Sequence, residues 1–337
     1  MTPDIRRLTP ERAGEVLAAI AGVRALVIGD LMLDEYLQGS VDRISPEAPV
    51  PVVHVDREWW ALGGAANVAA NVAALGASCE VVGVVGDDAG GQRLTDALAS
   101  LGARTSGVVA APGRPTTVKT RVMARSQQVV RYDREEARDV RPEVEAALIE
   151  AIRREAAGCQ VLILEDYNKG VLTSAVIRAV LQVGHEMDIP TVVDPKRLRF
   201  FEYGGVTLFK PNAKELADAL GEHLDPDDPE WMERTRVRLD CRTLLLTLGE
   251  RGVALVSEGG RFLRIPAVAR AVYDVSGAGD TVVAVAAVAL AAGADEFEAA
   301  ILANHAAALE VQKAGVATVS PDEILTQTRT FLSRGDS

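Results

Sequence analysis

The sequence predicts an α/β fold in which a mostly parallel central sheet carries helices on both faces and a small β flap lies beside it. Three observations lead to this fold class. Short apolar runs alternate with segments of helical composition, which is typical of parallel strands joined by crossover helices. Most of these runs are apolar without interruption, as expected for strands covered on both faces. Two stretches break the alternation with β-type residues only.

The elements of the central sheet follow one another in a regular order. A helix is expected first, ahead of the first strand. The apolar runs then predict strands at 25–29, 80–85, 161–164, 191–193, 207–209, 243–248 and 253–256. The segments between them predict helices at 65–75, 92–101, 143–156, 173–187 and 281–292.

The flap is predicted from residues 37–55 and 116–132. The first stretch places prolines between β-type residues, and the second contains two strands, TTVKTRVMA and QQVVRYD, joined near Arg125. Neither stretch has room for a crossover helix, so we expect antiparallel strands. Periodicity alone does not decide between a separate flap and ordinary decoration of a sheet edge.

Composition excludes several classes of protein. The 337 residues include 36 Lys and Arg against 48 Asp and Glu, a net charge of −12, whereas nucleic-acid binding normally needs a basic face. The longest apolar run, at 281–294, is about 14 residues, and a membrane span needs about 20. Cys79, Cys159 and Cys241 fit neither a disulfide framework nor a zinc motif, which favours a cytoplasmic protein.

The most informative stretch is DVSGAGD at 274–280, followed at once by an apolar segment. The small residues Gly277, Ala278 and Gly279 let backbone N–H groups approach an anion, and the positive end of a helix dipole adds to them. Asp280 at the mouth of this cradle would repel a phosphate. It suits a general base that takes a proton from an attacking hydroxyl, or else a helix N-cap after a glycine turn.

Other nucleotide-binding patterns are absent from the sequence. GxxxxGK[ST] occurs nowhere, so the loop at 274–280 is not a P-loop. The glycines at 83–90 do not form GxGxxG after the first strand, which disfavours a dehydrogenase.

The motifs together resemble the ribokinase/phosphofructokinase-B superfamily of sugar kinases. DVSGAGD resembles its C-terminal signature. Four further matches precede it in family order: GGAANVA at 63–69, VGDDAGG at 85–91, KPNAKE at 210–215 and TLGERG at 247–252. The resemblance implies one ribokinase-like three-layer sandwich over 1–337, with a lid formed by about 35–55 and 114–134. It also implies Mg²⁺ with ATP, and a homodimer by family analogy.

Within this superfamily, several segments resemble kinases that phosphorylate D-glycero-D-manno-heptose 7-phosphate at O1. These segments are VIGDLMLD at 27–34, RISPEAPVPV at 43–52, QQ at 127–128, DYNKG at 166–170 and DPK at 194–196. Such kinases serve ADP-heptose and lipopolysaccharide synthesis, and in many bacteria they are fused to a nucleotidyltransferase. No HxGH motif occurs here, so the resemblance implies a stand-alone kinase and a separate nucleotidyltransferase.

The resemblance assigns roles on the nucleotide side. Asp280 would be the base, and Gly277, Ala278 and Gly279 would hold the transferring phosphoryl group. The residues expected around ATP are Lys210, Asn212, Glu215, Thr247, Gly249, Gly252 and Asn304. Asn212 and Glu215 would hold Mg²⁺ through water, unless Asn212 only ends a strand in a turn. Lys210 would touch the γ-phosphate, unless it is simply solvated.

On the sugar side, hydroxyl ligands are expected among Asp34, Asp30, Gly64 and Asn67. Asp34 is the first candidate, and Asp30 has the alternative role of capping a turn. The sugar phosphate needs cations, for which the candidates are Lys119, Arg121, Arg125, Arg131, Lys169 and Lys196, although surface cations are often only solvated. Ser45 and Glu47 in the proline-rich flap segment are further candidates for sugar contact.

A monovalent cation such as K⁺ is a further expectation, because some relatives bind one beside the anion cradle, here at Asp274 and Ser276. The expected partners are ATP and a phosphorylated sugar. Two alternatives stay open: a kinase of another sugar, such as fructose 1-phosphate, ribose or a keto-deoxy sugar acid, and a non-catalytic sugar- or nucleotide-binding protein of the same fold.

Overall fold

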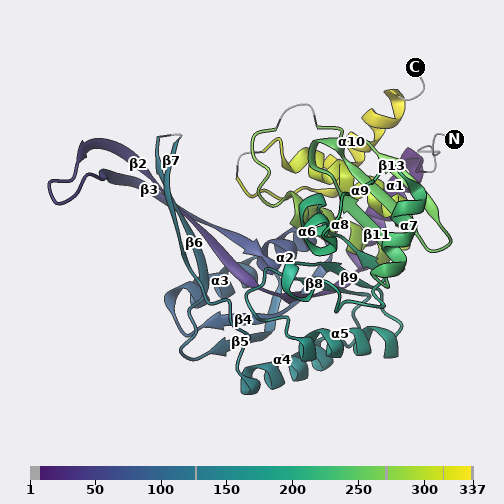
Figure 1. The fold of residues 1–337 in the computed structure, drawn as a ribbon, viewed down its shortest axis with the longest axis horizontal. Helices are drawn as coiled ribbons and strands as arrows, with labels where there is room; N and C mark the ends of the chain where they lie inside the picture. The colour runs from purple at the N-terminus through teal and green to yellow at the C-terminus, as the bar shows by residue number, and fades with distance from the viewer. Residues whose placement is uncertain (1–7, 126, 270–271, 314, 335–337) are drawn as a thin grey trace.

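A nine-stranded sheet forms the centre of the computed structural model, which describes residues 8–125, 127–269, 272–313 and 315–334 (Figure 1). In order across the sheet the strands are β13 (Arg261–Ile265), β12 (Val253–Ser257), β11 (Thr243–Thr247), β10 (Leu208–Phe209), β9 (Thr191–Asp194), β8 (Val161–Glu165), β1 (Arg24–Gly29), β4 (Ser78–Gly86) and β5 (Arg104–Ala111). All neighbours from β11 to β5 are parallel, whereas β12 pairs antiparallel with both β11 and β13 and so runs opposite to the other eight strands of this sheet.

Helices cover both faces of this sheet and make a three-layer sandwich. One layer contains α1 (Pro10–Ala19), α2 (Ala65–Ala74), α3 (Ala89–Ser100), α8 (Ala278–Ala291), α9 (Glu296–Glu310) and α10 (Pro321–Arg334). The other contains α4 (Pro142–Glu155), α5 (Ser174–Glu186), α6 (Ala213–Leu220) and α7 (Pro229–Arg238). Side chains of β1 alternate between the two cores, because Ala25 and Val27 join the first whereas Leu26 and Ile28 join the second.

A separate four-stranded sheet projects from one end of the sandwich (Figure 1). Its strands, in order, are β3 (Pro51–Gly64), β2 (Leu31–Ile44), β6 (Thr117–Ala124) and β7 (Gln127–Arg134). β2–β3 and β6–β7 are antiparallel hairpins, but β2 and β6 pair in parallel. The structure therefore confirms a flap rather than edge decoration, and it corrects the expectation that all its strands are antiparallel.

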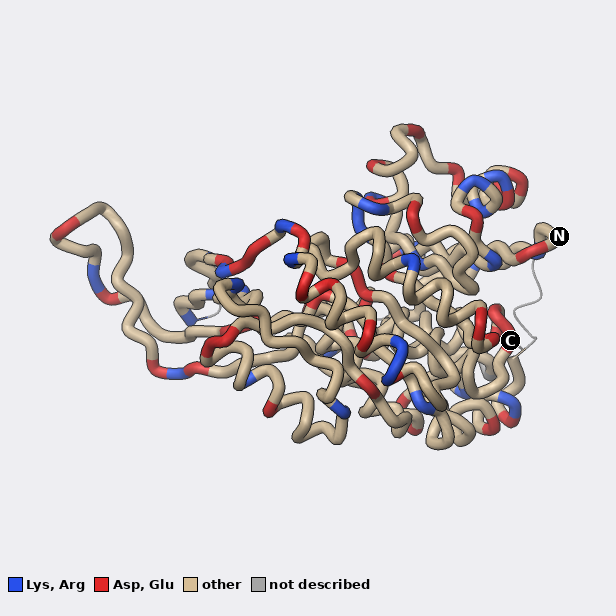
Figure 2. The backbone as a smooth tube through the Cα atoms, turned by 90° about the horizontal axis from the view of Figure 1, so that it is seen from below, with Lys and Arg blue, Asp and Glu red and all other residues tan. Residues whose placement is uncertain are grey.

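The seven strands and five helices predicted from sequence are all confirmed, with ends shifted by a few residues. Sequence reasoning missed the outer strands β5 and β13. Both lie at an edge of the sheet and are half-exposed, so they lack the continuous apolar run that marks a central strand. Figure 2 shows acidic and basic residues distributed along the whole chain. Among the described residues no helix has the length and apolar character of a membrane span.

The contact between β1 and β8 generates a stability prediction. A Cβ atom on Gly29 would lie 2.0 Å from the backbone carbonyl oxygen of Glu165, so Gly29→Ala must push these two strands apart. We expect the free energy of unfolding to fall by about 3 kcal/mol, measured by urea denaturation. Gly22→Ala is the matched control, because a Cβ there meets nothing within 4 Å, and it should change stability by less than about 1 kcal/mol. Equal effects of the two substitutions would contradict the prediction.

Candidate active site

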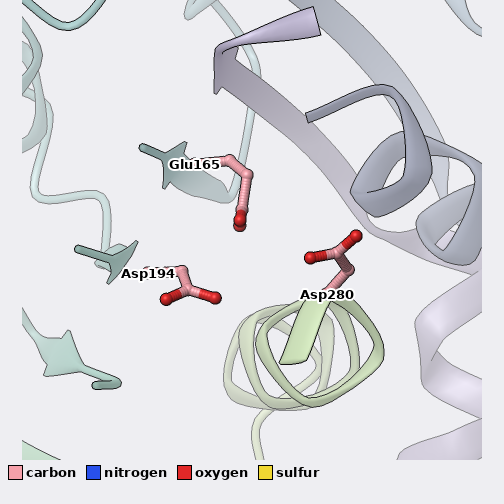
Figure 3. Close-up of side chains that lie close together, drawn as sticks. All are labelled: Glu165, Asp194 and Asp280. Atoms are coloured by element: carbon pink, nitrogen blue, oxygen red, sulfur yellow. The ribbon is translucent and has the colours of Figure 1, made fainter. Parts of the chain in front are cut away.

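Three buried carboxylates meet at the carboxyl edge of the central sheet. Glu165 ends β8, Asp194 ends β9 and Asp280 lies in the first turn of α8. Figure 3 shows the three side chains pointing toward one another, and one oxygen of each lies within 4.8 Å of the others. The parallel register pairs Glu165 directly with Asp194, so the topology of the sheet itself creates this cluster.

The predicted anion cradle lies at the start of α8. Gly277 is the N-cap residue, with φ of 95°, and no described side chain caps the helix. The residues after Asp280 are buried all round, from Thr281 to Ala289, so the helix axis is fixed in the core and its positive end faces the site. The interpretation of Asp280 as an N-cap is wrong, because Gly277 occupies that position.

Two hydrogen bonds hold the carboxylate of Asp280. Asn67 on α2 donates its side-chain amide to Oδ2 at 2.7 Å, and the Tyr167 hydroxyl donates to Oδ1 at 3.0 Å. Burial raises the pKa of Asp280 to about 6, and the hydrogen bonds from Asn67 and Tyr167 oppose that rise. The group is therefore ionised at neutral pH and is still basic enough to accept a proton.

Two lysines place positive charge beneath the cradle. Lys210 Nζ lies 2.8 Å from Asp194 Oδ2, and Lys196 Nζ lies 3.3 Å from Asp194 Oδ1. Burial alone would raise the pKa of Asp194, but these two ammonium groups lower it below its ordinary value. A Cβ on Gly279 would lie 3.5 Å from Lys210 Nζ, so an anion at the helix start would meet this ammonium as well. The alternative that Lys210 is a solvated surface lysine is wrong, since it is buried.

Glu165 is a site residue that sequence reasoning missed. It is fully buried, and neither carboxylate oxygen has a hydrogen-bond partner within the described part of the chain. Burial, followed by the negative charges of Asp194 and Asp280, raises its pKa well above the ordinary range. A polar group left in this state is satisfied only by a ligand or a water molecule. Its one sequence signal was its position directly after an apolar strand.

Asp30 holds the loop that carries Tyr167. Its carboxylate accepts the backbone N–H groups of Tyr167 at 2.7 Å, Lys169 at 3.0 Å and Val171 at 3.3 Å. Asp30 is only 1% exposed. This is the turn-stabilising role that the sequence left open, so the geometry does not favour Asp30 as a sugar ligand.

Asp34 lies on the face of the second sheet that carries Arg121, and the two side chains form an ion pair. Two glycines lie close to the start of this sheet. A Cβ on Gly63 would lie 2.8 Å from Asp34 Oδ2, and Gly64 has a φ of 55° and would place a Cβ 2.5 Å from the carbonyl oxygen of Asp30. The structure therefore brings the predicted sugar ligands Asp34, Gly64 and Asn67 to the junction of β2, β3 and α2.

Two predicted sugar ligands lie elsewhere. Ser45 lies at the turn of the long β2–β3 hairpin, where its hydroxyl accepts the Glu47 N–H at 3.2 Å. This turn projects away from the sandwich (Figure 1), and the contact of Ser45 with the sugar stays a prediction. Lys196 pairs with Glu215 at 2.7 Å as well as with Asp194, and its Nζ atom lies 4.8 Å from the centroid of the Tyr167 ring.

Four further predicted cations are Lys119 on β6, Arg125 in the turn after β6, Arg131 and Lys169. Arg131 pairs with Asp133 at 3.1 Å and is half-exposed. Lys169 pairs with Glu135 at 2.7 Å and is largely covered.

The predicted nucleotide residues lie beyond β9. Asn212 and Glu215 form a capping box at the start of α6, with both hydrogen bonds 2.8 Å long, so Asn212 is the N-cap of this helix. Thr247 pairs with Asn212 across an isolated bridge. Asn304 donates its side-chain amide to the carbonyl of Pro266 at 2.9 Å and so positions the segment after β13.

Two glycines shape the turn between β11 and β12. Gly249 and Gly252 have φ values of 60° and 80°. A Cβ on Gly252 would lie 2.2 Å from the Ile265 carbonyl oxygen, so only glycine fits there.

The loop before the cradle contains the predicted monovalent-cation residues. Asp274 accepts the Ser276 N–H at 2.9 Å. Beside this loop lies Glu310, which is fully buried and would be 3.3 Å from a Cβ on Gly277. Burial and then the negative charge of Asp274 raise the pKa of Glu310 to about 8. Within the described residues no Lys or Arg pairs with Glu310, so a cation bound here would stabilise the ionised form of this carboxyl and lower its pKa.

The fold and this site define an α/β phosphotransferase that uses a hydroxyl as the acceptor. A family model described as pfkB family carbohydrate kinase matches residues 24–323. The chain therefore belongs to this family and is a sugar kinase.

Two curated proteins named HldE are similar to this chain in sequence. The chain is 46% identical to the bifunctional protein HldE of Geotalea uraniireducens and 47% identical to that of Bradyrhizobium diazoefficiens. Each alignment covers 90% of this chain and 63% of the relative. The chain thus spans less than two thirds of the length of these relatives.

Solved structures confirm the ribokinase-like fold. Arabidopsis thaliana ribokinase complexed with ribose and ATP superimposes with a TM-score of 0.70 at 20% identity, covering 90% of this chain and 98% of that one. Phosphofructokinase-2 of Escherichia coli in complex with potassium gives 0.76 at 20% identity, with 93% and 99% covered.

Tyr167 generates a prediction about pH dependence. Its hydrogen bond stabilises ionised Asp280, so Tyr167→Phe should raise the pKa of the base and move the acidic limb of kcat/KM upward by about one pH unit. The measurement is a pH profile of kcat/KM.

Tyr203→Phe is the matched control for this profile, because it removes a buried tyrosine–carboxylate hydrogen bond, to Asp166 at 2.8 Å, that does not involve Asp280. An acidic limb that stays in place in Tyr167→Phe, or moves equally in both variants, would show that Tyr167 does not tune the base.

Proposed function

We propose that this kinase transfers the γ-phosphoryl group of ATP to O1 of D-glycero-D-manno-heptose 7-phosphate and produces the 1,7-bisphosphate. The observation that carries the reaction is the buried carboxylate of Asp280, held by two donors at the start of α8. The heptose substrate is supported by the identity of 46–47% with relatives named HldE and by the motifs at 27–34 and 166–170. The product would enter ADP-heptose and lipopolysaccharide synthesis through a nucleotidyltransferase.

In the proposed step, Asp280 takes the proton of the sugar hydroxyl while the oxygen of that hydroxyl forms a bond to the γ-phosphorus. The bond between that phosphorus and the bridging oxygen of ATP breaks, and ADP leaves with the electron pair. The N–H groups at 277–279 and the ammonium of Lys210 stabilise the charge on the transferring group.

Mg²⁺ is proposed to accompany ATP and to neutralise phosphate charge when bound. Asn212 and Glu215 would hold it through water. The donor chemistry fits, since Glu215 and the nearby Asp194 offer the oxygen ligands that Mg²⁺ prefers, and Lys196 links these two carboxylates.

The second sheet is proposed to act as a lid of a single kinase domain that excludes water from the reaction. Its outer hairpins expose a set of apolar side chains: Val41, Ile44, Val55, Val130 and Tyr132. Exposed apolar side chains on one sheet favour coverage by a partner, and we propose a second copy in a homodimer.

A monovalent cation, K⁺, is proposed to bind beside Asp274 and Ser276. The unpaired buried carboxylate of Glu310 supports a cation at this place. We expect activity to rise as KCl replaces a tetraalkylammonium salt at constant ionic strength, and unchanged activity would remove the proposal.

Substrate choice is tested by ADP release from Mg·ATP with a panel of sugars. We expect strong turnover with heptose 7-phosphate and much weaker turnover with heptose, fructose 1-phosphate, fructose 6-phosphate and ribose. Phosphorus NMR should show a 1,7-bisphosphate. Preference for another sugar would overturn the heptose assignment and leave the fold and the role of Asp280 in place. ATP binding with no turnover on any sugar would favour a non-catalytic binding protein.

Asp280→Asn tests the base. Turnover should fall by about 10²- to 10⁴-fold, while the affinity for ATP stays close to that of the wild type. The folded-state pKa of about 6 lies above the ordinary value of 3.8, so ionisation of Asp280 weakens the folded state as pH rises through this range. The variant should therefore unfold at no lower urea concentration than the wild type at pH 7. Turnover close to the wild type would exclude Asp280 as the base.

A further inference from the structure

The cations around the sugar side of the site differ in whether they are already neutralised. Arg121, Arg131 and Lys169 each have a carboxylate partner: Asp34, Asp133 and Glu135 respectively. Lys119 lies among them on β6 and makes no ion pair within the described part of the chain. An ammonium without a counter-ion is the one best placed to receive an anionic ligand.

The register of the second sheet explains why Lys119 is unpaired. It lies opposite Asp34 on β2 and opposite Asp133 on β7. Each of these carboxylates instead pairs with an arginine. Asp34 pairs with Arg121, two positions after Lys119 on β6, and Asp133 pairs with Arg131, two positions before it on β7. The two carboxylates opposite Lys119 are therefore already neutralised by arginines.

Lys119 lies close to the reaction centre. Its Nζ atom is 5.2 Å from the centroid of the Tyr167 ring, and the hydroxyl of the same ring donates to Asp280. One aromatic side chain thus separates the unpaired ammonium from the base. A sugar with its reacting hydroxyl at Asp280 can present a phosphate on its far end to Lys119.

The electrostatic surroundings also favour an anion. Burial lowers the pKa of Lys119, and the ammonium of Lys169 lowers it further, against the attraction of Asp34. A phosphate bound to the half-buried ammonium of Lys119 would supply the negative charge that this group lacks within the described residues.

We propose that Lys119 binds the phosphate carried by the sugar and makes this kinase select a phosphorylated sugar over the free sugar. The inference rests on the proposed function, whose substrate it deepens. It distinguishes Lys119 from Arg121 and Arg131, whose charges are engaged within the sheet.

The test compares kcat/KM for heptose 7-phosphate and for heptose in wild type and Lys119→Met. We expect the value for the phosphorylated sugar to fall by about 30-fold or more and the value for heptose to change by less than about 3-fold. Lys119→Arg keeps the charge and should restore most of the preference. Arg178→Met, which removes one positive charge from an exposed position on α5, is the control for net charge and should leave both values unchanged.

The outcomes separate this inference from the proposed function. If the wild type phosphorylates heptose 7-phosphate but Lys119→Met lowers both values equally or neither, the role of Lys119 is overturned and the function stands. If the wild type acts only on sugars without phosphate, both are overturned. Urea denaturation of Lys119→Met identifies a folding defect, and a Lys119→Arg variant that folds but loses the preference for the phosphorylated sugar also overturns the role.

Discussion

The burial of Asp280 is the constraint on which the rest of the site depends. A carboxylate among other carboxylates in a dry core is unfavourable unless its neighbours donate hydrogen bonds or positive charge. Asn67 and Tyr167 supply the hydrogen bonds, and the start of α8 supplies its dipole. Lys210 and Lys196 compensate the adjacent Asp194. The same groups that make the negative charge tolerable also prepare the site for a phosphoryl group.

The support of the base extends through several elements. Asn67 donates to Asp280 and Thr281 donates to Asn71 at 3.2 Å, so α2 and α8 are linked twice, and within α2 Asn71 donates to the side-chain oxygen of Asn67 at 3.3 Å. On the other side Asp30 fixes the backbone of Tyr167. Asp280 is therefore positioned from β1, α2 and the loop after β8, which gives a defined geometry to a residue in a short first turn.

Much of the fold was readable from sequence because central parallel strands are apolar on both faces, and the alternation with helices was correspondingly clear. Asp280 and the glycines before it were also predictable, since they form a contiguous motif with a direct chemical meaning. Glu165 was not, because a single glutamate after a strand gains its meaning only from its register with Asp194. The pairing of Asp34 with Arg121 was likewise hidden, since it depends on β2 and β6 lying in parallel.

The attachment of the second sheet has a mechanical consequence. Asp30 is the only residue between β1 and β2, and β3 passes into α2 with no residue between Gly64 and Ala65. The sheet is thus tethered at its base by two very short junctions, one after Gly29, with φ of 157°, and one at Gly64, with φ of 55°. Asn67 lies in the first turn of α2, directly after the second junction, so a tilt of the sheet would act on the residue that donates to Asp280.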